Sequence, residues 1–326
     1  MDLDIASIAD RIAALLEGPF YSDAGVVKTP LEYSAALSGL SGCSVYLKCE
    51  NLQTSGSFKI RGATSAVLNL SEADKVKGVI TASSGNHGAA TAMAASALGI
   101  TVTIYVPESI SAFKEEKISR CGATLIKVPG GGEIAEREAA RVAGEKGLTY
   151  ISPYNHLDII AGQGTVGEEI LADLPDVDAI FASVGGGGLI SGIGCRVYPQ
   201  VEILGCWPEH SPAMLECMKA GKVIDVPEQA TLSDGTAGGV EEDALTLPLC
   251  KALISSSVTV SESEIAHAMK LVHDHHGYVI EGAAGVALAG LLQNSGRHQG
   301  GNVVIVLCGA NVSEDTFKAA MEMAEG

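Results

Sequence analysis

The chain has 326 residues, of which 39 are glycine and 47% are hydrophobic, and its 21 Lys and Arg against 39 Asp and Glu give a formal charge of −18. This length buries a sizeable core in one large domain or two smaller ones, and abundant glycine with few aromatics is typical of α/β proteins. So acidic a surface repels a phosphate backbone, and we expect no nucleic acid partner.

The first residues, "MDLDIASIADRIAALLEG", carry acids where a signal peptide carries lysines, and their apolar residues recur at helical spacing. No apolar run in the sequence reaches membrane-spanning length. The eight cysteines are scattered, with no C-x-x-C pair, which indicates reduced thiols. We therefore expect a cytoplasmic protein that does not associate with a membrane.

Short β-branched runs follow in chain order and alternate with helical patterns, of which 88–99, 133–147 and 263–277 are the clearest. The predicted strands are Gly78–Ser83, Thr101–Pro107, Ala123–Val128, Ala179–Val184, Val201–Trp207 and Asn302–Cys308. This alternation predicts an α/β fold with a doubly wound, mostly parallel sheet.

The same pattern predicts two domains. The segment 52–149 reads as a self-contained run of strands and helices, bracketed by "GGGE" and "SPYNHLD". We expect it to form a small α/β domain inserted into a large domain made of 1–51 and 150–326.

Ligands of such sheets bind outside the carboxyl ends of the strands, so the loops after the predicted strands are the candidate sites. Gly185–Gly194, "GGGGLISGIG", runs from a strand into a helix. Consecutive glycines allow backbone N–H groups to converge on an anion at a helix N-terminus, which indicates a phosphate site. The pattern matches neither a nucleotide P-loop nor a dinucleotide motif. A tight structural turn is the alternative, although one or two glycines would be enough for it.

Two further strand ends carry polar or reactive residues. Ser83–Ala90, "SSGNHGAA", offers hydroxyls, an amide and free N–H donors at a helix start, which suits a carboxylate or a ring oxygen; an ordinary helix cap is the alternative. Cys308–Asn311, "CGAN", places a thiol at a strand end, where it is either functional or a small buried hydrophobe.

Lys59 lies in "TSGSFKIRGA", between a Ser/Gly-rich turn and a run of small and basic residues. A lysine near a phosphate site and an anion-binding loop can form a Schiff base with a phosphorylated aldehyde. Taken alone, Lys59 is better explained as a solvated lysine that begins a helix.

The order of these motifs resembles the fold-type-II pyridoxal 5′-phosphate enzymes, specifically the serine/threonine dehydratase and serine racemase family, over nearly the whole chain. "SGSFKIRGA" is similar to the motif of the cofactor lysine, "SSGNHG" to the substrate-carboxylate loop and "GGGGL" to the phosphate loop. "PYNHLDIIAGQGTVGEEIL" is similar to a further stretch of this family.

The resemblance implies pyridoxal 5′-phosphate as the cofactor, bound mainly by the large domain, and assigns roles to individual residues. Lys59 and Ser84 are implied as catalytic. The implied cofactor-binding residues are Phe58, Lys59, Asn86, Gly185, Gly186, Gly187, Gly188, Leu189, Gly235, Glu281 and Cys308. The implied substrate-binding residues are Ser83, Ser84, Gly85, Asn86 and His87.

The resemblance also implies a reaction. Cys308 would face the ring nitrogen as a neutral partner, so the ring would be a weaker electron sink and loss of a β-hydroxyl would be favoured. Lys59 would remove the Cα proton, and hydroxide would leave toward the cofactor phosphate. The expected enzyme is an L-serine/L-threonine ammonia-lyase that releases a 2-oxo acid and ammonia from a small β-hydroxy amino acid.

Several alternatives stay open. A serine racemase or a 3-hydroxyaspartate dehydratase has the same scaffold, and a non-catalytic protein that binds a phosphorylated ligand belongs to another class. Some relatives bind a divalent cation through a Glu-Pro sequence, but here "CWPEHSPAM" has Trp207 before Pro208, so we expect no metal. We also expect a homodimer.

Overall fold

The computed structural model describes residues 5–22 and 25–325. Its larger sheet has six strands in the order β1-β2-β10-β7-β8-β9. β1 pairs antiparallel with β2, and every other pair in this sheet is parallel. The strands are β1 (Leu31–Tyr33), β2 (Ser44–Lys48), β7 (Ala179–Ser183), β8 (Glu202–Pro208), β9 (Ser256–Val260) and β10 (Asn302–Val306).

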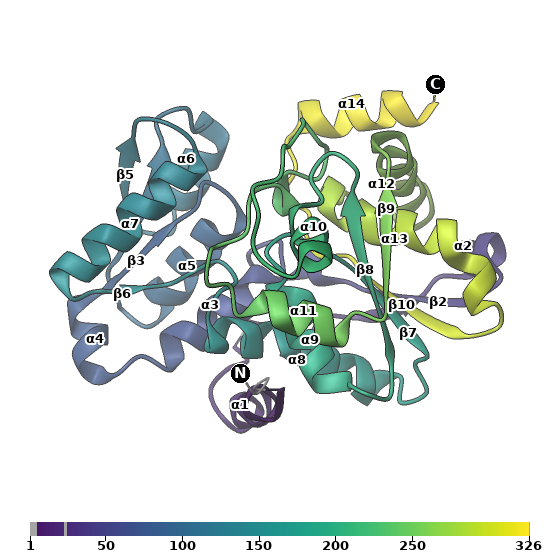
Figure 1. Ribbon diagram of the computed structural model, residues 1–326, viewed down its shortest axis with the longest axis horizontal. Coiled ribbons are helices and arrows are strands. Elements are labelled where there is room, and N and C mark those ends of the chain that lie inside the picture. The colour runs from purple at the N-terminus through teal and green to yellow at the C-terminus, as the bar shows by residue number, and fades with distance from the viewer. Residues whose placement is uncertain (1–4, 23–24, 326) are drawn as a thin grey trace.

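The smaller sheet has four parallel strands in the order β5-β4-β3-β6. They are β3 (Val79–Ala82), β4 (Val102–Pro107), β5 (Thr124–Val128) and β6 (Thr149–Tyr150). Figure 1 shows this sheet and its helices on the left of the molecule and the six-stranded sheet on the right.

Helices connect and cover the strands of both sheets. They are α1 (Ile5–Glu17), α2 (Ala35–Ser41), α3 (Lys59–Leu68), α4 (Glu72–Lys77), α5 (Asn86–Ala97), α6 (Ala112–Ser119), α7 (Gly132–Lys146), α8 (Leu157–Asp173), α9 (Gly188–Val197), α10 (Ala213–Ala220), α11 (Thr246–Leu253), α12 (Glu262–His276), α13 (Gly282–Asn294) and α14 (Glu314–Glu325). Short 3₁₀ turns occupy Glu50–Leu52, Asp234–Thr236 and Ser295–His298.

The α/β fold class with parallel sheets is confirmed. All six predicted strands are present within two residues of their expected ends, as β3, β4, β5, β7, β8 and β10. β1, β2, β6 and β9 were not predicted from the sequence. The strands of the smaller sheet all fall within 79–150, whereas the domain boundaries at 52 and 149 stay a prediction.

Local sequence signals explain where the predicted helices begin and end. α12 begins with a capping box, in which Ser261 accepts from the Glu264 N–H while the Glu264 carboxylate accepts from the Ser261 N–H. Gly277 and Gly147 end α12 and α7 in the left-handed conformation, with φ of 70° and 60°. Glycine removes the steric cost that a side chain would bring at both positions.

Two large clusters of buried apolar side chains stabilise the fold. One lies around the six-stranded sheet and includes Phe181 and Trp207. The other joins α1, α3, α5 and α8 and includes Ile8, Ile60 and Ile159. Because α3 contacts both α5 and α8, the second cluster joins the helices beside the smaller sheet to α8.

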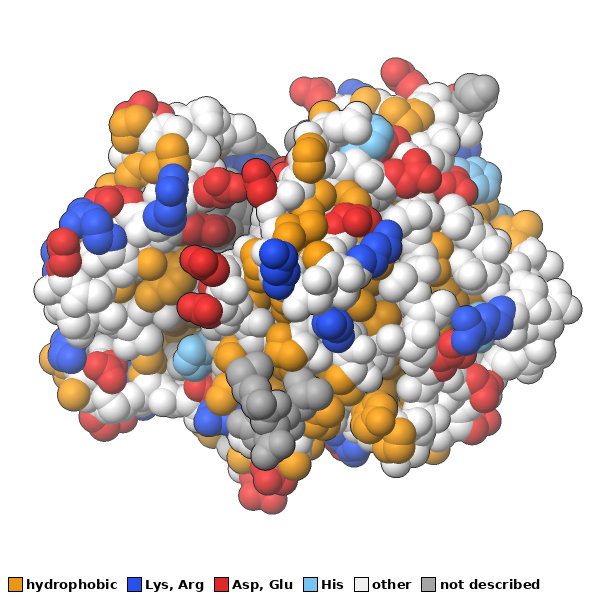
Figure 2. All heavy atoms as spheres, viewed as in Figure 1, with side chains coloured by type: hydrophobic (Ala, Val, Ile, Leu, Met, Phe, Trp, Pro, Cys, Tyr) orange, Lys and Arg blue, Asp and Glu red, His pale blue; other side chains and the backbone are white. Residues whose placement is uncertain are grey.

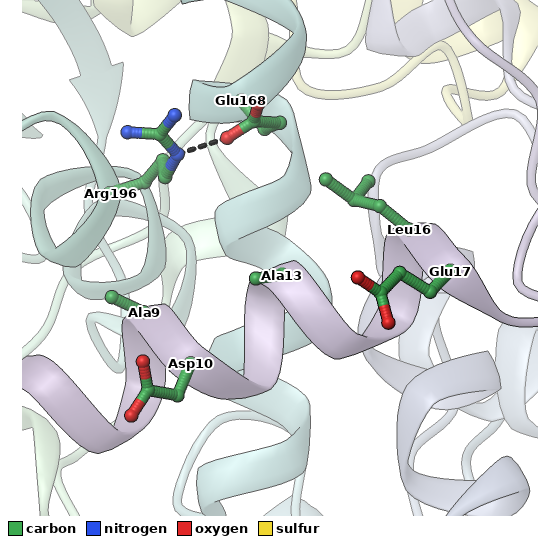
Figure 3. Close-up of a pocket in the computed structure, with 7 residues that line it drawn as sticks. All are labelled: Ala9, Asp10, Ala13, Leu16, Glu17, Glu168 and Arg196. Carbon is green, nitrogen blue, oxygen red and sulfur yellow. Dashed lines mark hydrogen bonds and ion pairs between the residues drawn. The ribbon is translucent and has the colours of Figure 1, made fainter.

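α1 packs along α8 and α9, as its helical spacing of apolar residues requires. Figure 3 shows an open groove beside it, lined by residues such as Ala13, Leu16 and Glu17, where Arg196 pairs with Glu168. None of the residues that line this groove is a predicted site residue. Within residues 5–22 and 25–325, no helix combines the length and the apolarity that crossing a bilayer requires.

Candidate active site

Lys59 is the first residue of α3, and backbone contacts fix it at the end of β10. The Phe58 N–H donates to the Cys308 carbonyl at 3.0 Å, and Ser57 forms a β-bridge with Gly309. The Lys59 ammonium donates to the Pro153 carbonyl at 3.0 Å and lies 5.3 Å from the centre of the Phe58 ring. The lysine therefore points to the carboxyl ends of the strands, where ligands of parallel sheets bind.

The Lys59 amine is electrostatically prepared for proton transfer. Burial lowers the pKa of Lys59 to about 8, although the nearby acidic groups Cys308, Glu281 and Glu136 act in the opposite direction. A lysine with a pKa near neutrality has a substantial unprotonated fraction, and this form acts as a nucleophile or a general base. Lys59 is therefore not the solvated lysine of the alternative interpretation.

The glycine loop between β7 and α9 presents backbone rather than side chains. Gly187 has a φ of 84° and directly precedes α9, whose first N–H groups have no partner within the helix. A Cβ on Gly186 would lie 2.3 Å from the Tyr154 ring, and one on Gly185 would lie 3.0 Å from Thr236. Close packing thus requires glycine here, and the N–H groups at the helix end are free to bind an anion.

The glycine loop and Lys59 meet at one short segment. Lys59 donates to the carbonyl of Pro153, and the next residue, Tyr154, packs against Gly186 and would contact a Cβ on Gly188. The loop and the amine are therefore close enough to contact one small ligand.

The loop from Ser83 to His87 joins β3 to α5 and brings its own donors. The Ser83 hydroxyl accepts from the Gly85 N–H at 3.1 Å, and among the described residues the Ser84 hydroxyl has no hydrogen-bond partner. His87 is buried, and its Nε2 lies 3.1 Å from the Ile151 carbonyl and 3.0 Å from the Thr81 hydroxyl. Burial, and the charge of Lys59, lower the pKa of His87 to about 3, so its ring is neutral.

Asn86, Glu281 and Cys308 form a connected polar group beside Lys59. The Asn86 amide donates to both Glu281 carboxylate oxygens, at 2.9 and 3.1 Å. The Cys308 thiol donates to Glu281 at 3.7 Å and accepts from the Ser183 hydroxyl at 3.6 Å. Burial, and the nearby Glu281, raise the pKa of Cys308, so this thiol is uncharged at neutral pH. Burial likewise raises the pKa of Glu281.

The remaining predicted residues lie around this group. Gly235 is in the 3₁₀ turn Asp234–Thr236, where a Cβ would lie 3.3 Å from a Glu281 oxygen. Leu189 is the second residue of α9 and is buried in the core of the larger sheet. The structure thus brings together the ends of β3, β7 and β10 and the start of α3.

Some residues of this region were not identified from the sequence. Asn311, at the end of "CGAN", donates through its side-chain amide to the side-chain oxygen of Asn86 at 2.6 Å, and Lys117 on α6 donates to the side-chain oxygen of Asn311. Glu136 on α7 and Glu241 lie near each other, and burial, with Glu241 and Glu133, raises the pKa of Glu136 to about 7. No local sequence signal marks these residues, because their proximity depends on how the two sheets are arranged.

Known proteins resemble this chain over most of its length. The family described as "Pyridoxal-phosphate dependent enzyme" matches residues 23–309. The chain belongs to this family. An L-threonine ammonia-lyase of Thermotoga maritima is 39% identical over 290 residues, which cover 88% of this chain and 72% of that protein. A serine racemase of Arabidopsis thaliana is 36% identical over 305 residues, covering 90% and 92%.

A solved structure of similar fold supports the same assignment. The processed form of threonine deaminase isoform 2 from Solanum lycopersicum superposes with a TM-score of 0.91 at 31% identity, covering 98% of this chain and 94% of that one. The recognition of the family from its motifs is therefore confirmed, and with it the fold and pyridoxal phosphate as the cofactor.

The residues of this pyridoxal-phosphate-dependent enzyme fit the cofactor. The loop Gly185–Gly188 has backbone donors at a helix N-terminus for a phosphate, and its packing against Tyr154 and Thr236 leaves no room for side chains. Lys59 has an amine of lowered pKa, and the Asn86 amide and the neutral Cys308 thiol lie beside it. Among the described residues, no group of three or more His, Cys, Asp or Glu side chains is arranged to hold a metal ion.

Proposed function

We propose that this enzyme is an L-serine/L-threonine ammonia-lyase that releases a 2-oxo acid and ammonia. The observation that carries the proposal is the pair formed by the Lys59 amine, whose pKa is about 8, and the neutral Cys308 thiol, both at the end of β10. When bound, the cofactor supplies an aldehyde that bonds to amines and an aromatic ring that withdraws electrons from the attached Cα.

The residues of the chain then have distinct tasks. The free Lys59 amine accepts the proton from Cα, and its lowered pKa keeps part of it unprotonated at neutral pH. The N–H groups at the start of α5, together with Ser83, bind the substrate carboxylate. The neutral Cys308 thiol would offer the ring nitrogen of the bound cofactor no negative partner, so negative charge on Cα would be stabilised less and loss of the neighbouring hydroxyl would be favoured.

The charges around Lys59 favour a substrate with an uncharged side chain. Glu136 interacts with Glu133, Glu241 and Lys59, so several carboxylates face the same region. Figure 2 shows acidic side chains gathered along the hollow between the two parts of the molecule. A second substrate carboxylate, as in 3-hydroxyaspartate, would be repelled there. Serine and threonine carry no such charge.

Racemisation is a second candidate, and Ser84 is the observation that favours it. Racemisation requires an acid on the cofactor face opposite Lys59, because one base that returns its own proton restores the starting enantiomer. The Ser84 hydroxyl has no partner among the described residues, so it is available for this role. Its hydroxyl is a weak acid, and we expect D-serine to form more slowly than pyruvate.

A direct assay tests the function. The purified, cofactor-loaded protein is incubated with L-serine, L-threonine and both 3-hydroxyaspartate diastereomers, and 2-oxo acid release is measured. We expect release from serine and threonine, and a visible absorbance band that disappears with borohydride. Faster release from a hydroxyaspartate would refute the substrate assignment. A protein without this band would instead be a non-catalytic binder of a phosphorylated ligand.

We also propose a cytoplasmic homodimer. Within residues 5–22 and 25–325, no cysteine forms a disulfide, which suits a reducing compartment. Large apolar side chains are exposed on and beside the edge strand β1, where Tyr33 is 55% and Leu40 59% exposed. An exposed apolar edge of this kind is suited to association with a second copy. Sedimentation analysis of the protein, and of Leu40→Glu, tests this assembly.

A further inference from the structure

Lys117 reaches from the smaller sheet's helices to the loop that follows β10. It lies in the last turn of α6, and its ammonium donates to the side-chain oxygen of Asn311 and, at 3.3 Å, to the backbone carbonyl of Ser55. One turn earlier, Lys114 pairs with Asp234 at 2.8 Å. Both lysines therefore make long-range contacts, but only Lys117 contacts a residue bonded to Asn86.

The contacts of Asn311 allow its amide one orientation. Lys117 has only donors, so Asn311 must present its oxygen to it. The Ser55 carbonyl oxygen can only accept, so Asn311 must present its side-chain nitrogen to it, and these two atoms lie 3.1 Å apart. The same nitrogen lies 2.6 Å from the Asn86 side chain, which must therefore accept through its oxygen.

The orientation of Asn86 follows. Because its oxygen accepts from Asn311, its nitrogen is directed to Glu281 and to the region beside Lys59. Glu281 alone would not fix this orientation, since a carboxyl group donates when protonated and accepts when ionised. Burial raises the pKa of Glu281, which makes the protonated form more accessible. The contact from Asn311 does not change in this way.

We propose that Lys117 is a positioning residue that, through Asn311, keeps the donor side of the Asn86 amide directed at the cofactor. The proposal rests on the proposed function and on the family resemblance, which implies that Asn86 lies near the hydroxyl oxygen of the cofactor ring. Lys117 touches neither the substrate nor the reacting atoms. Together with the Ser55 carbonyl, to which it also donates, Lys117 determines which atom of Asn86 the cofactor meets. A wrongly oriented amide would present an oxygen to another oxygen.

Titration of the apoprotein with pyridoxal 5′-phosphate tests the proposal without an activity measurement. Lys117→Met keeps the length of the side chain and removes the charge and the donors. We expect its dissociation constant to rise about tenfold, the effect of one poorly formed hydrogen bond, with a shifted absorbance maximum of the bound cofactor. Lys117→Arg keeps donors only and should restore both properties to within about threefold of wild type.

Two further variants make the result decisive. Lys114→Met removes the ion pair with Asp234 but leaves Asn311 untouched, so it should bind the cofactor like wild type. Asn311→Asp keeps an oxygen for Lys117 but has no N–H group for Asn86. We expect it to lose affinity to the same degree as Lys117→Met, with no further loss when the two changes are combined.

The outcomes separate this proposal from the proposed function. A wild-type protein that fails to bind pyridoxal phosphate would overturn the function itself. A wild-type protein that binds it, while Lys117→Met or Asn311→Asp binds equally well with an unchanged spectrum, would overturn only the positioning role. Equal losses in Lys114→Met and Lys117→Met would also overturn it, because the cause would then be a general loosening of α6.

Discussion

The buried guanidinium of Arg61 offers the sharpest test of the energetics of this fold. Arg61 lies on α3, two residues after Lys59, and is fully buried. It donates twice to Glu50, at 2.7 and 2.8 Å, and twice to Glu169, at 2.7 and 2.9 Å. Lys48 also donates to Glu169, at 2.6 Å. Two cations and two carboxylates thus neutralise one another between β2, α3 and α8.

Arg61→Met should destabilise the protein severely. The change leaves Glu50 and Glu169 buried with Lys48 as the one cation of this group, and removing one partner of a buried ion pair costs about 3 to 5 kcal/mol. For a chain of 326 residues, the loss corresponds to a fall in unfolding temperature of roughly 4 to 7 °C. The stability of Arg61→Lys should lie between those of the wild type and Arg61→Met, because an ammonium cannot form both bidentate contacts.

The pH dependence of this loss identifies its cause. Burial would raise the pKa of Glu169, but Arg61 and Lys48 outweigh burial and hold it below the ordinary value. In the wild type, its stabilisation is therefore present above the unfolded pKa, about 4.3, and is lost as the pH falls through the lower folded value. Without Arg61 the folded pKa should lie above the unfolded one, so the carboxyl can neutralise by binding a proton. The difference in the free energy of unfolding between the wild type and Arg61→Met should therefore be smaller at pH 5 than at pH 8.

Equilibrium urea unfolding of the apoprotein at these two pH values measures both effects. Arg141→Met is the matched control, because Arg141 also pairs with two glutamates, Glu138 and Glu145, but on an exposed helix face. It should leave the unfolding midpoint nearly unchanged. The electrostatic reasoning would be refuted if Arg61→Met lost no more free energy of unfolding than Arg141→Met, or if its loss did not vary with pH.

The remaining predictions concern the site. Lys59→Ala should abolish turnover and covalent attachment of the cofactor while the circular dichroism spectrum is retained; turnover near wild type would contradict the assignment. Gly187→Val should weaken cofactor retention, because φ is 84° and the Cβ would lie 2.7 Å from the Cys250 sulfur; Gly144→Val, where a Cβ meets open space, is the control, and equal retention in both would indicate a plain turn. Cys308→Ser should keep most elimination activity, whereas Cys308→Asp should shift the cofactor absorbance by favouring a protonated ring; an Asp variant with wild-type spectrum and rate would place Cys308 elsewhere. Ser84→Ala should remove D-serine formation and spare pyruvate release, measured by chiral chromatography; loss of pyruvate release with intact binding would show that Lys59 is not the sole base of elimination.

The sequence predicted the buried parallel strands because their apolar, β-branched runs are unbroken. β7 and β10 lie inside the larger sheet, and nearly all of their residues are buried. The missed strands lack this pattern. β6 has two residues and β1 three, and β9, "SSVTV", is a polar strand at the sheet edge. β2, "SVYLK", ends on Lys48, whose buried position depends on Glu169 far along the chain.

The residues of the site fall into the same two groups, those that a local sequence pattern marks and those that no such pattern marks. Residues that belong to a strand end followed by a helix, such as Gly187 and Asn86, could be proposed from local sequence because glycines and polar residues there have few structural explanations. Lys117 and Glu136 could not. Each lies on a helix beside the smaller sheet, and its contacts depend on which residues of the larger sheet's loops it meets. A charged residue on an amphipathic helix is normally solvated, so nothing local distinguishes these two.

The net charge of −18 bears differently on a polyanion and on a single phosphate. A nucleic acid backbone contacts a wide surface and meets its many carboxylates. A phosphate bound at the start of α9 instead meets oriented N–H groups within the first turn, where the helix dipole acts over a few ångströms. Exposed carboxylates beyond about 8 Å are largely screened at physiological salt. An acidic protein can therefore bind an anionic cofactor tightly without a cationic side chain in its phosphate loop, and Gly185–Gly188 contains none.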